Sequence, residues 1–303
     1  MRLLFILQTV SFYISNTSIK AVSAVTGRKK SAIHKACRRN IPEGLIINGI
    51  ITDENALCRE LKQFCHENSL HTDNSILTIS GKNIMSKIVN VPQTSSRNIL
   101  KLIKNEFSDV ENIQNYVFDY TIINPSNPDN TVSLLACAAD SDTIKSYDEL
   151  FKNAGIKIKS MNIAVNAAVK LMRNFSGTEK TTCLLAVMDG NTLSPYLFTD
   201  GIFNFSNTSR LIQERGTEAL INETAGIISS FIQFSKTLRN QSDISDVYFC
   251  GMNEQESRMC SRISGMLGIN AAVLPRCCQD IVSYPDNFRI SEYIYNTGNL
   301  MKP

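Results

Sequence analysis

Residues 12–20 read FYISNTSIK, a short polar run between two apolar segments. Ser, Asn and Thr favour tight turns, and the flanking β-branched and aromatic side chains favour strands. The sequence therefore predicts a β-hairpin with strands at 7–14 and 19–25 and a turn at 15–18. A basic, polar stretch for which no element is predicted continues to residue 39.

A second hairpin opens the other half of the chain. The dipeptide Asp189-Gly190 is a strong hairpin-turn signal, and apolar segments at 182–188 and 193–199 flank it. A third strand is predicted at 202–205. The chain therefore divides into two halves, each beginning with a polar-turned hairpin or meander, with a linker at 176–178.

Helical and strand patterns fill the space between these hairpins. Asp53 is a predicted helix N-cap, followed on one face by Leu57, Leu61, Phe64 and Cys65. A second helix face carries Ile99, Leu102, Ile103 and Phe107. Segments 76–80 and 84–91 are predicted to pair as a hairpin around 81–83. Further strands are predicted at 116–123, 132–138, 156–162, 247–251 and 271–274, and further helices at 144–153, 163–173, 218–238 and 254–266. The residues after 275 show no clear period.

Composition excludes several classes of protein. Of the 303 residues, 43% are hydrophobic and 19% are charged, which excludes a disordered chain, a coiled coil and a collagen-like fibre. The net charge is only +3, and the one basic cluster, at 28–30, is short, so we expect no nucleic-acid partner. The sequence has no apolar run of about 18 residues, the length that spans a bilayer.

The cysteines and histidines do not form a recognisable site. The nine cysteines include no C-x-x-C pair, and the three histidines lack metal-ligand spacing and a nucleophile partner. We therefore predict no metal site, no catalytic residues, and reduced thiols in a cytosol. The apolar start of the chain allows a signal peptide cleaved near 21–24 as an alternative, although Gln8, Thr9 and Ser11 interrupt the apolar stretch and favour the hairpin.

Two halves of this kind facing each other across a nucleotide cleft are characteristic of the actin-like ATPase superfamily. The chain resembles that superfamily through one family, the type IV pilus assembly protein PilM, over residues 12–275. The segments that carry the resemblance are 12–20 at the first phosphate loop, 41–53 and 118–123 around an inserted subdomain, 132–139, 147–156, 199–201 and 209–210 in the second half's meander, 215–216, and 249–252 at the adenosine loop.

The resemblance implies an α/β, actin-like (ribonuclease H-like) two-domain fold with an inserted α+β subdomain in the first half. The expected divisions are 1–44 and 119–175 for the first half, 45–118 for the inserted subdomain, 176–275 for the second half, and 276–303 for a C-terminal tail.

The resemblance also implies a set of residues around a nucleotide cleft. They are Ser15, Asn16, Thr17, Ser18, Lys20, Asp189, Gly190, Asn191, Thr192, Glu223, Gly251 and Met252. Each has a plainer interpretation, as a turn residue, a strand residue or a solvated charge.

Several positions depart from the family's pattern. Tyr13 stands in place of the first loop's Asp and Ser15 in place of its Gly, while Val187 replaces the second loop's Asp. Cys250 replaces an adenosine-loop glycine, and Asn162 replaces an expected Asp. A Mg-nucleotide site needs carboxylates for the cation and free N–H groups for phosphate. We therefore expect a degenerate cleft without a cofactor, with Mg-ATP binding as the alternative.

For function, the resemblance implies a cytoplasmic scaffold of a type IV pilus or competence-type machine, peripheral to the inner face of the cytoplasmic membrane. Its expected partner is the N-terminal tail of a single-span, PilN-like inner-membrane protein, held in a groove to which 45–118 contributes. Membrane contact would be indirect, and pilus ATPases would be further partners. The alternatives are a functional ATP-binding switch and a sugar kinase-like enzyme of the same superfamily. The kinase ranks lower because no Asp stands out as a catalytic base.

Overall fold

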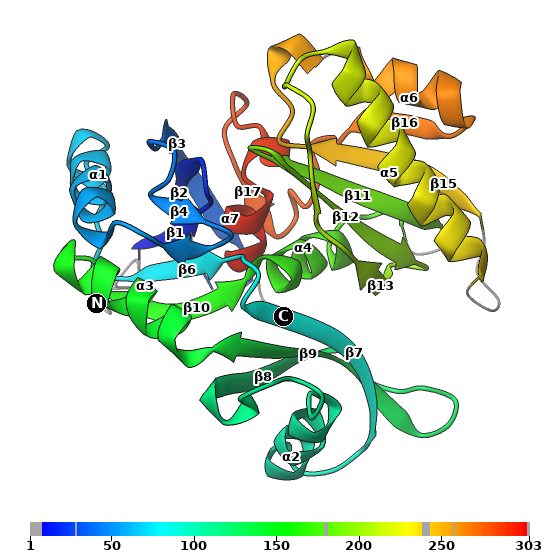
Figure 1. Cartoon of the computed structure of the whole chain (residues 1–303), viewed down its shortest axis with the longest axis horizontal. Coiled ribbons are helices and arrows are strands. Elements are labelled where there is room, and N and C mark those ends of the chain that lie inside the picture. Colours follow the sequence, from blue (N-terminus) through cyan, green and yellow to red (C-terminus); the bar gives the residue numbers. More distant parts are fainter. Residues whose placement is uncertain (1–7, 28, 179–180, 238–242, 257, 302–303) are drawn as a thin grey trace, which may run out of the picture.

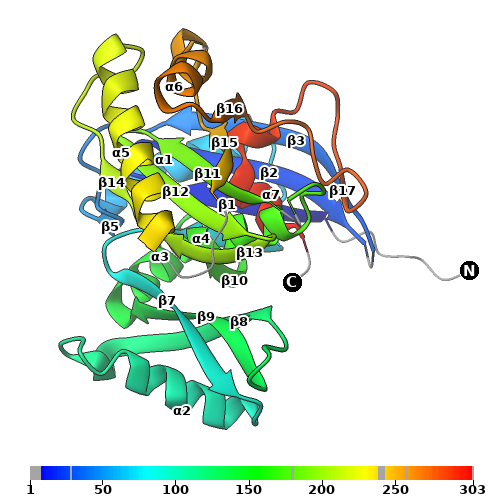
Figure 2. The same ribbon diagram turned by 90° about the vertical axis from the view of Figure 1, so that its right-hand side faces the viewer.

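The computed structural model describes residues 8–27, 29–178, 181–237, 243–256 and 258–301. Two α/β halves lie side by side, and a small body built on a three-stranded sheet extends from the first half (Figure 1). The view turned by 90° shows the same small body below both halves (Figure 2).

The first half is built on a six-stranded sheet. Its strands are β1 (Gln8–Ile14), β2 (Ser18–Thr26), β3 (Ser31–Asn40), β6 (Ser75–Ile79), β10 (Ile158–Ile163) and β17 (Val282–Ser283). Their order is β10-β6-β1-β2-β3-β17. The antiparallel β1–β2 pair confirms the predicted first hairpin, except for Leu7, which lies outside the described residues. A two-stranded hairpin, β4 (Ile46–Ile47) and β5 (Ile50–Ile51), lies beside the sheet.

Two helices, α1 (Glu54–Glu67) and α3 (Ser141–Asn153), form one core with this sheet. The predicted face of α1 is confirmed: Leu57, Leu61 and Phe64 are fully buried, while Cys65 is partly buried. Asp53 accepts a hydrogen bond from the Ala56 N–H and so caps the helix as predicted. Because the apolar period of α1 matches 3.6 residues per turn, its buried stripe faces the sheet.

The basic stretch before residue 40 forms β3, which the sequence did not predict. It pairs with β2 along its whole length. Its first residues alternate, with Ser31 and Ile33 buried and His34 exposed, and Arg38 near its end is also exposed. Charged side chains on the solvent face reduced the apolar signal, although every residue of β3 except His34 has a partner in β2.

The predicted hairpin of 76–80 with 84–91 does not form. β6 lies between β10 and β1 in the first sheet, whereas β7 (Ile84–Pro92) belongs to a different sheet. The chain leaves the first sheet at Gly81, where a Cβ atom would lie only 2.9 Å from the Gly49 Cα. A close approach of two backbones, rather than a turn between paired strands, explains the glycine at this position.

The small body contains β7, β8 (Tyr116–Asn124) and β9 (Thr131–Asp140), with α2 (Ser96–Glu106) on one face. On and just after α2, Ile99, Ile103 and Phe107 are buried as predicted, whereas Leu102 is 37% exposed. The three-stranded sheet of the small body is formed by strands that lie between residues 84 and 140. The expected subdomain of 45–118 shares only part of this range, because α1 and β6 pack in the core of the first half.

The second half follows the predicted meander. Its strands are β11 (Thr182–Asp189), β12 (Thr192–Thr199), β13 (Ile202–Ser206), β14 (Ser209–Arg210), β15 (Ile244–Cys250) and β16 (Asn270–Val273). The sheet order is β13-β12-β11-β15-β16, and β14 pairs with β12. Helices α5 (Glu218–Thr237) and α6 (Met259–Leu267) contribute to its core. Residue 238 of the predicted long helix lies outside the described residues.

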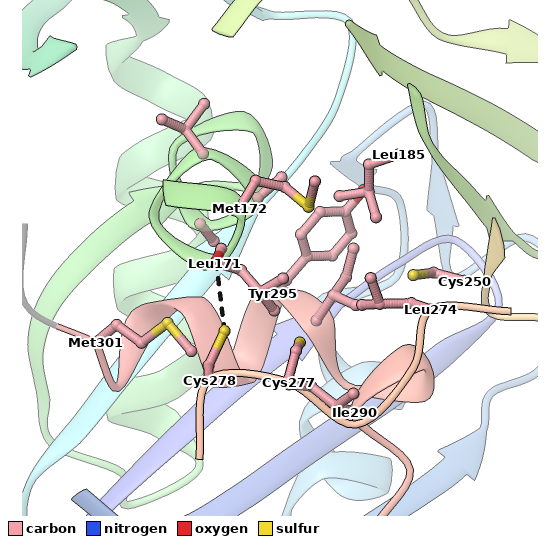
Figure 3. Packing of buried hydrophobic residues seen from close by; sticks show 14 of the residues in the cluster. Leu171, Met172, Leu185, Cys250, Leu274, Cys277, Cys278, Ile290, Tyr295 and Met301 are labelled. Carbon is pink, nitrogen blue, oxygen red and sulfur yellow. Dashed lines mark hydrogen bonds between the residues drawn. The ribbon is translucent and has the colours of Figure 1, made fainter. Parts of the chain in front are cut away.

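The expected C-terminal tail contributes to the core between the halves. β17 pairs with β3, and all six residues of α7 (Ile294–Asn299) are buried. α7 packs beside α4 (Ala164–Arg173), and its Tyr295 lies among apolar residues of both halves (Figure 3). Asn296 donates hydrogen bonds to the carbonyl oxygens of Ser11 and Lys20. A six-residue helix that is buried on every side shows no amphipathic period, so the sequence pattern does not reveal it.

Substitution of Gly298 tests the position of α7. A Cβ atom at Gly298 would lie 2.0 Å from the Ala167 carbonyl oxygen, so Gly298→Ala must displace α7 or α4. We expect it to lower the free energy of unfolding by about 2 kcal/mol or more, measured by denaturant titration. Gly265→Ala in α6 is the matched control, because nothing lies within 4 Å of its added methyl group. The control should gain up to about 1 kcal/mol. Equal effects of the two substitutions would contradict this packing.

Candidate functional site

The turns of the two leading hairpins meet between the halves. A Cβ atom on Gly190, in the β11–β12 turn, would lie 2.6 Å from the Thr17 Cγ2 in the β1–β2 turn. Gly190 has φ +56°, which favours glycine. The residues expected to face each other across a cleft are therefore in direct contact.

A hydrogen bond joins the halves beside these turns. The Tyr13 hydroxyl donates to Asp189 Oδ2 over 2.6 Å, and its oxygen lies 3.3 Å from Ser80 Oγ. Tyr13 is only 3% exposed. Burial, together with the negative charge of Asp189, raises the pKa of Tyr13 well above its usual value, so the phenol stays protonated and can donate. The residue expected in place of the first loop's Asp thus binds Asp189, a carboxylate two residues after Val187.

Lys20 is buried behind this hydrogen bond. Its ammonium group lies 5.9 Å from the centroid of the Tyr13 ring, and the residue is 6% exposed. Burial lowers the pKa of Lys20, while the charges of Asp189 and Glu292 raise it in part. A cavity of about 10 Å³ beside Lys20 is lined by both carboxylates. This volume holds at most one water molecule, far less than a phosphate chain.

Three backbone N–H groups of the first loop and one of the expected adenosine loop are bonded within the chain. The Ser15 N–H donates to the Ser18 carbonyl, and the N–H groups of Thr17 and Ser18 donate to Ser15 Oγ. In the second half, the Gly251 N–H donates to the Ser291 carbonyl over 2.9 Å. A phosphate would have to break the bonds of Ser15, Thr17 and Ser18 before these N–H groups could bind it.

Other predicted site residues also have partners within the protein. Asn16 accepts a hydrogen bond from the Gly49 N–H, and Thr192 donates to the Asp189 carbonyl. Glu223 accepts from the N–H groups of Ile212 and Gln213 and so fastens the preceding loop to α5.

The predicted residues are divided between two large cavities. One cavity of about 540 Å³ is lined by Ser15, Asn16, Asp189 and Thr192 among others, and one of about 550 Å³ is lined by Met252. The small cavity at Lys20 shares residues with both, and Gly251 lines it. Tyr13 and Asp189 line both the small cavity and the cavity of about 540 Å³. Asn191 lies in the β11–β12 turn, where its carbonyl accepts from the Leu211 N–H.

The sequence interpretation missed Arg215 as a site residue, although it placed 215–216 near a family turn. The Arg215 guanidinium donates to the carbonyl oxygens of Gly190 and Gly251, both of which belong to predicted loops. In the sequence, the only local sign of a tight turn here is the glycine at position 216. In the structure this residue has φ +84°. In the described part of the chain, no group of three His, Cys, Asp or Glu side chains could hold a metal ion.

The comparison with protein families determines the membership of the chain. The family described as type IV pilus assembly protein PilM matches residues 12–193, which is more than half of the sequence and includes both hairpin turns. The chain belongs to the PilM family. The predicted family is thereby confirmed.

Solved structures confirm the actin-like fold of this PilM-family protein. The PilM–PilN type IV pilus biogenesis complex contains a chain with a TM-score of 0.81 and 14% identity, covering 98% of this chain and 100% of that one. A Bacteroides thetaiotaomicron protein with an actin-like ATPase fold and unknown function has a TM-score of 0.58 and 11% identity, covering 97% and 95%. The cytoplasmic domain of EpsL from the type II secretion system of Vibrio cholerae has a TM-score of 0.53 and 8% identity, covering 98% and 96%. No curated protein sequence matches significantly.

Among the described residues of the PilM-family chain, no helix has the length and apolarity required to cross a bilayer. The nine cysteines are free of disulfides. Burial raises the pKa of several thiols, to about 11 for Cys37 and about 12 for Cys183, so these groups stay protonated at neutral pH.

The buried tyrosines predict how stability depends on pH. Burial raises the pKa values of Tyr13 and Tyr295, and raises that of Tyr196 to about 12. A group whose pKa is raised by folding stabilises the protein below its unfolded pKa, about 10 for tyrosine, and this stability is lost as pH rises toward the folded value. We expect the free energy of unfolding to fall above about pH 10, measured by urea titration with tyrosinate absorbance.

Tyr13→Phe is the matched variant for this dependence. It should be less stable at pH 8 by about 1–3 kcal/mol, because Asp189 loses a donor, yet its alkaline loss should be shallower than that of the parent. The lowered pKa of Lys20 makes the free energy of unfolding rise with pH, which opposes the effect of the tyrosines, but Lys20 is present in both proteins. The same alkaline slope in parent and variant would show that Tyr13 ionises freely.

Proposed function

We propose that this PilM-family protein is a cytoplasmic scaffold of a type IV pilus or competence-type assembly machine, and that it holds the N-terminal tail of a PilN-like, single-span partner without a bound nucleotide. The observation that carries the nucleotide-free part is the 2.6 Å hydrogen bond from Tyr13 to Asp189. It closes the cleft at the point where phosphates would lie between the two hairpin turns.

Three further features support a cleft that needs no ligand. The space beside Lys20 is too small for phosphate, the loop N–H groups are bonded within the chain, and the Arg215 guanidinium bonds to both second-half loops. A nucleotide would have to replace these contacts with its own. The alternative, an ATP-dependent switch, finds support in the cavity of about 540 Å³, because Asp189 and Thr192 still line it.

We place the tail-binding groove between the small body and the first half. A cavity of about 230 Å³ is lined there by apolar side chains, among them Val117 of β8, Leu135 of β9 and Met161 of β10. In the described chain, β8 and β10 are each the last strand of their sheet. A sheet edge offers unpaired N–H and C=O groups to an extended segment, so a tail could bind by adding a strand.

The lining of this groove indicates the chemistry of the tail. Asp119 is its one charged residue, while Leu135, Cys137 and Ala139 present an apolar sheet face. An extended tail of about 8–12 residues would place alternate side chains on this face. Apolar burial would dominate its binding, so we expect only weak salt dependence.

The partner and location follow from the family. The similar structure with TM-score 0.81 is that of a PilM–PilN complex. We infer a PilN-like partner for this chain, with pilus ATPases as further partners and peripheral placement at the inner face of the cytoplasmic membrane. The partner's span would supply the membrane contact. The residues of the three-stranded sheet, 84–140, would form the partner-binding subdomain together with β10.

Nucleotide independence can be tested by thermal shift. We expect about 1 mM Mg-ATP to change the Tm by less than about 1 °C, because stabilisation by a ligand grows only as its concentration exceeds Kd. A fluorescent ATP analogue should likewise show no saturable, magnesium-dependent binding. An affinity tighter than about 10 μM that requires magnesium would support the switch instead.

The groove can be tested with two arginine substitutions on β8. Val117 lines the groove and is 50% exposed, whereas Ile122, 44% exposed, lies outside its lining on the same strand. Val117→Arg should weaken binding of the fluorescent N-terminal tail of the PilN-like protein from the same genome at least about tenfold, measured by anisotropy at low and high salt. Ile122→Arg should bind like the parent. Equal binding by the two variants would move the partner site elsewhere.

A further inference from the structure

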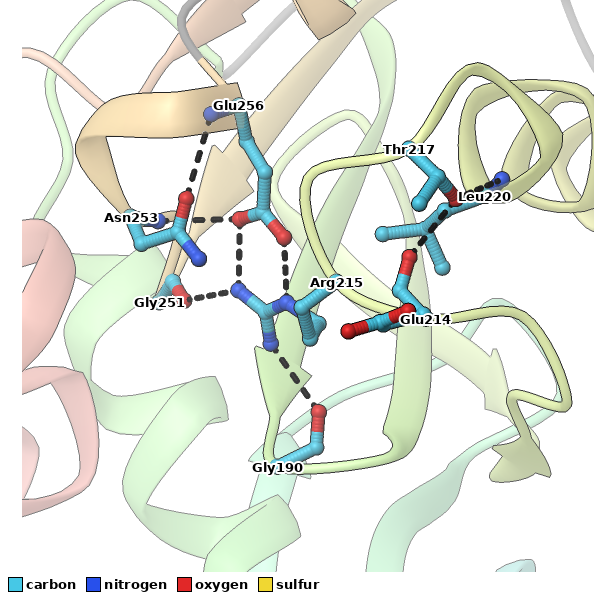
Figure 4. A network of polar contacts seen from close by, with 8 residues as sticks. All are labelled: Gly190, Glu214, Arg215, Thr217, Leu220, Gly251, Asn253 and Glu256. Carbon is cyan, nitrogen blue, oxygen red and sulfur yellow. Dashed lines mark hydrogen bonds and ion pairs between the residues drawn. The ribbon is translucent and has the colours of Figure 1, made fainter.

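One arginine connects three separate loops of the second half. Arg215 lies between β14 and α5, and its Nε and Nη2 both donate to the carboxylate of Glu256 (Figure 4). Glu256 belongs to a short 3₁₀ helix, η2 (Glu254–Glu256), and is only 2% exposed. This two-point geometry is the strongest that an arginine and a carboxylate can form.

The remaining donors of the guanidinium reach two backbone carbonyls. Nη1 donates to the Gly190 oxygen over 3.0 Å, and Nη2 donates to the Gly251 oxygen over 3.0 Å. Gly190 lies in the β11–β12 turn, and Gly251 follows β15. One planar cation therefore connects these two loops to η2.

The buried carboxylate has a further partner within its own turn. Glu256 accepts a hydrogen bond from the Asn253 N–H over 2.9 Å, and its own N–H donates to Asn253 Oδ1. The carboxylate is thus fully paired only while Arg215 is in place. Removal of one partner from a buried ion pair is far more disruptive than loss of an exposed pair.

The loop that carries Arg215 is held in position from both sides. Glu223 binds the N–H groups of Ile212 and Gln213 ahead of it. After it, a Cβ atom on Gly216 would lie 2.9 Å from Gln255 Oε1, so the loop lies directly against η2. Because its backbone is fixed, the side chain reaches Glu256 with little loss of freedom.

We propose that the Arg215 guanidinium is an internal ligand, which binds Glu256, Gly190 and Gly251 and holds these three loops of the second half in their observed arrangement. This inference rests on the nucleotide-independent cleft proposed above and names the group that maintains it. It assigns Arg215 a positioning role, in which a side chain of the protein supplies the contacts between loops that a bound molecule would otherwise supply.

Arg215→Ala would leave behind a vacant site of defined chemistry. A buried carboxylate and two carbonyl oxygens would remain, arranged to accept a planar cation with several donors. A small guanidinium compound should therefore bind the variant and restore its stability, whereas a simple ammonium ion of the same charge should not. Methylguanidinium chloride is the probe, and methylammonium chloride at the same concentration is the control for charge and ionic strength.

The experiment measures the Tm of the whole protein without nucleotide or partner. Arg215→Ala should lower the Tm by at least about 6 °C, and millimolar methylguanidinium should recover part of that loss in the variant without raising the Tm of the parent. The matched control is Arg262→Ala, which removes an exposed ion pair with Glu218 in the same half and should shift the Tm by less than about 2 °C.

Arg215→Lys covers the case in which Arg215→Ala does not fold. Lysine keeps the charge but cannot span the carboxylate and both carbonyls, so its Tm should lie clearly below that of the parent. A parental Tm for Arg215→Lys, a loss in Arg215→Ala no larger than in Arg262→Ala, or equal effects of the two probe cations would each overturn the proposal. None of these outcomes tests the tail-binding groove or Mg-ATP binding, because neither the partner's tail nor the nucleotide is present in the experiment.

Discussion

The arrangement of the two halves depends on the close packing of α7 between them. The absence of a side chain at Gly298 lets the helix approach the α4 backbone, and Asn296 bonds to carbonyls of β1 and β2. The centroid of the Tyr295 ring lies 4.7 Å from the centroid of the Tyr13 ring. The Tyr295 hydroxyl oxygen lies 2.8 Å from the hydroxyl oxygen of Tyr196 in the second half. The Tyr13 phenol that donates to Asp189 therefore packs against a helix that is buried on every side.

The cavity of about 540 Å³ and the proposed groove share part of one wall. Ile79 at the end of β6 and Ile163 at the end of β10 line both the 540 Å³ cavity and the 230 Å³ cavity. β6 also pairs in parallel with β1, which carries Tyr13. A tail that pairs with β10 would therefore contact the same strand ends that line the cavity of about 540 Å³. A scaffold gains from a rigid wall at this point, since an ordered groove reduces the entropy lost when a tail binds.

Local chemistry made much of the fold predictable. Turn residues predicted both leading hairpins, and helical spacing predicted the buried face of α1 around Leu61. Elements determined by distant contacts were missed. β3 is charged on its solvent face, α7 has no solvent-exposed side, and β6 and β7 belong to different sheets although only four residues separate them. At the site, the departure at Tyr13 was visible in the sequence, whereas the bond that it forms with Asp189 and the reach of Arg215 depend on the folded chain.

The buried α7 also has a consequence for the order in which the protein is made. The helix follows every strand of both halves in sequence, so a ribosome must translate past residue 299 before the halves can dock around it. Most of each sheet can form during synthesis, although β17 joins the first sheet only after the second half is made, and the surfaces that later enclose α7 remain exposed to water until α7 is made. Such nascent apolar surfaces are the usual targets of chaperones. The last step of folding would therefore be the assembly of the cleft itself, after translation of α7.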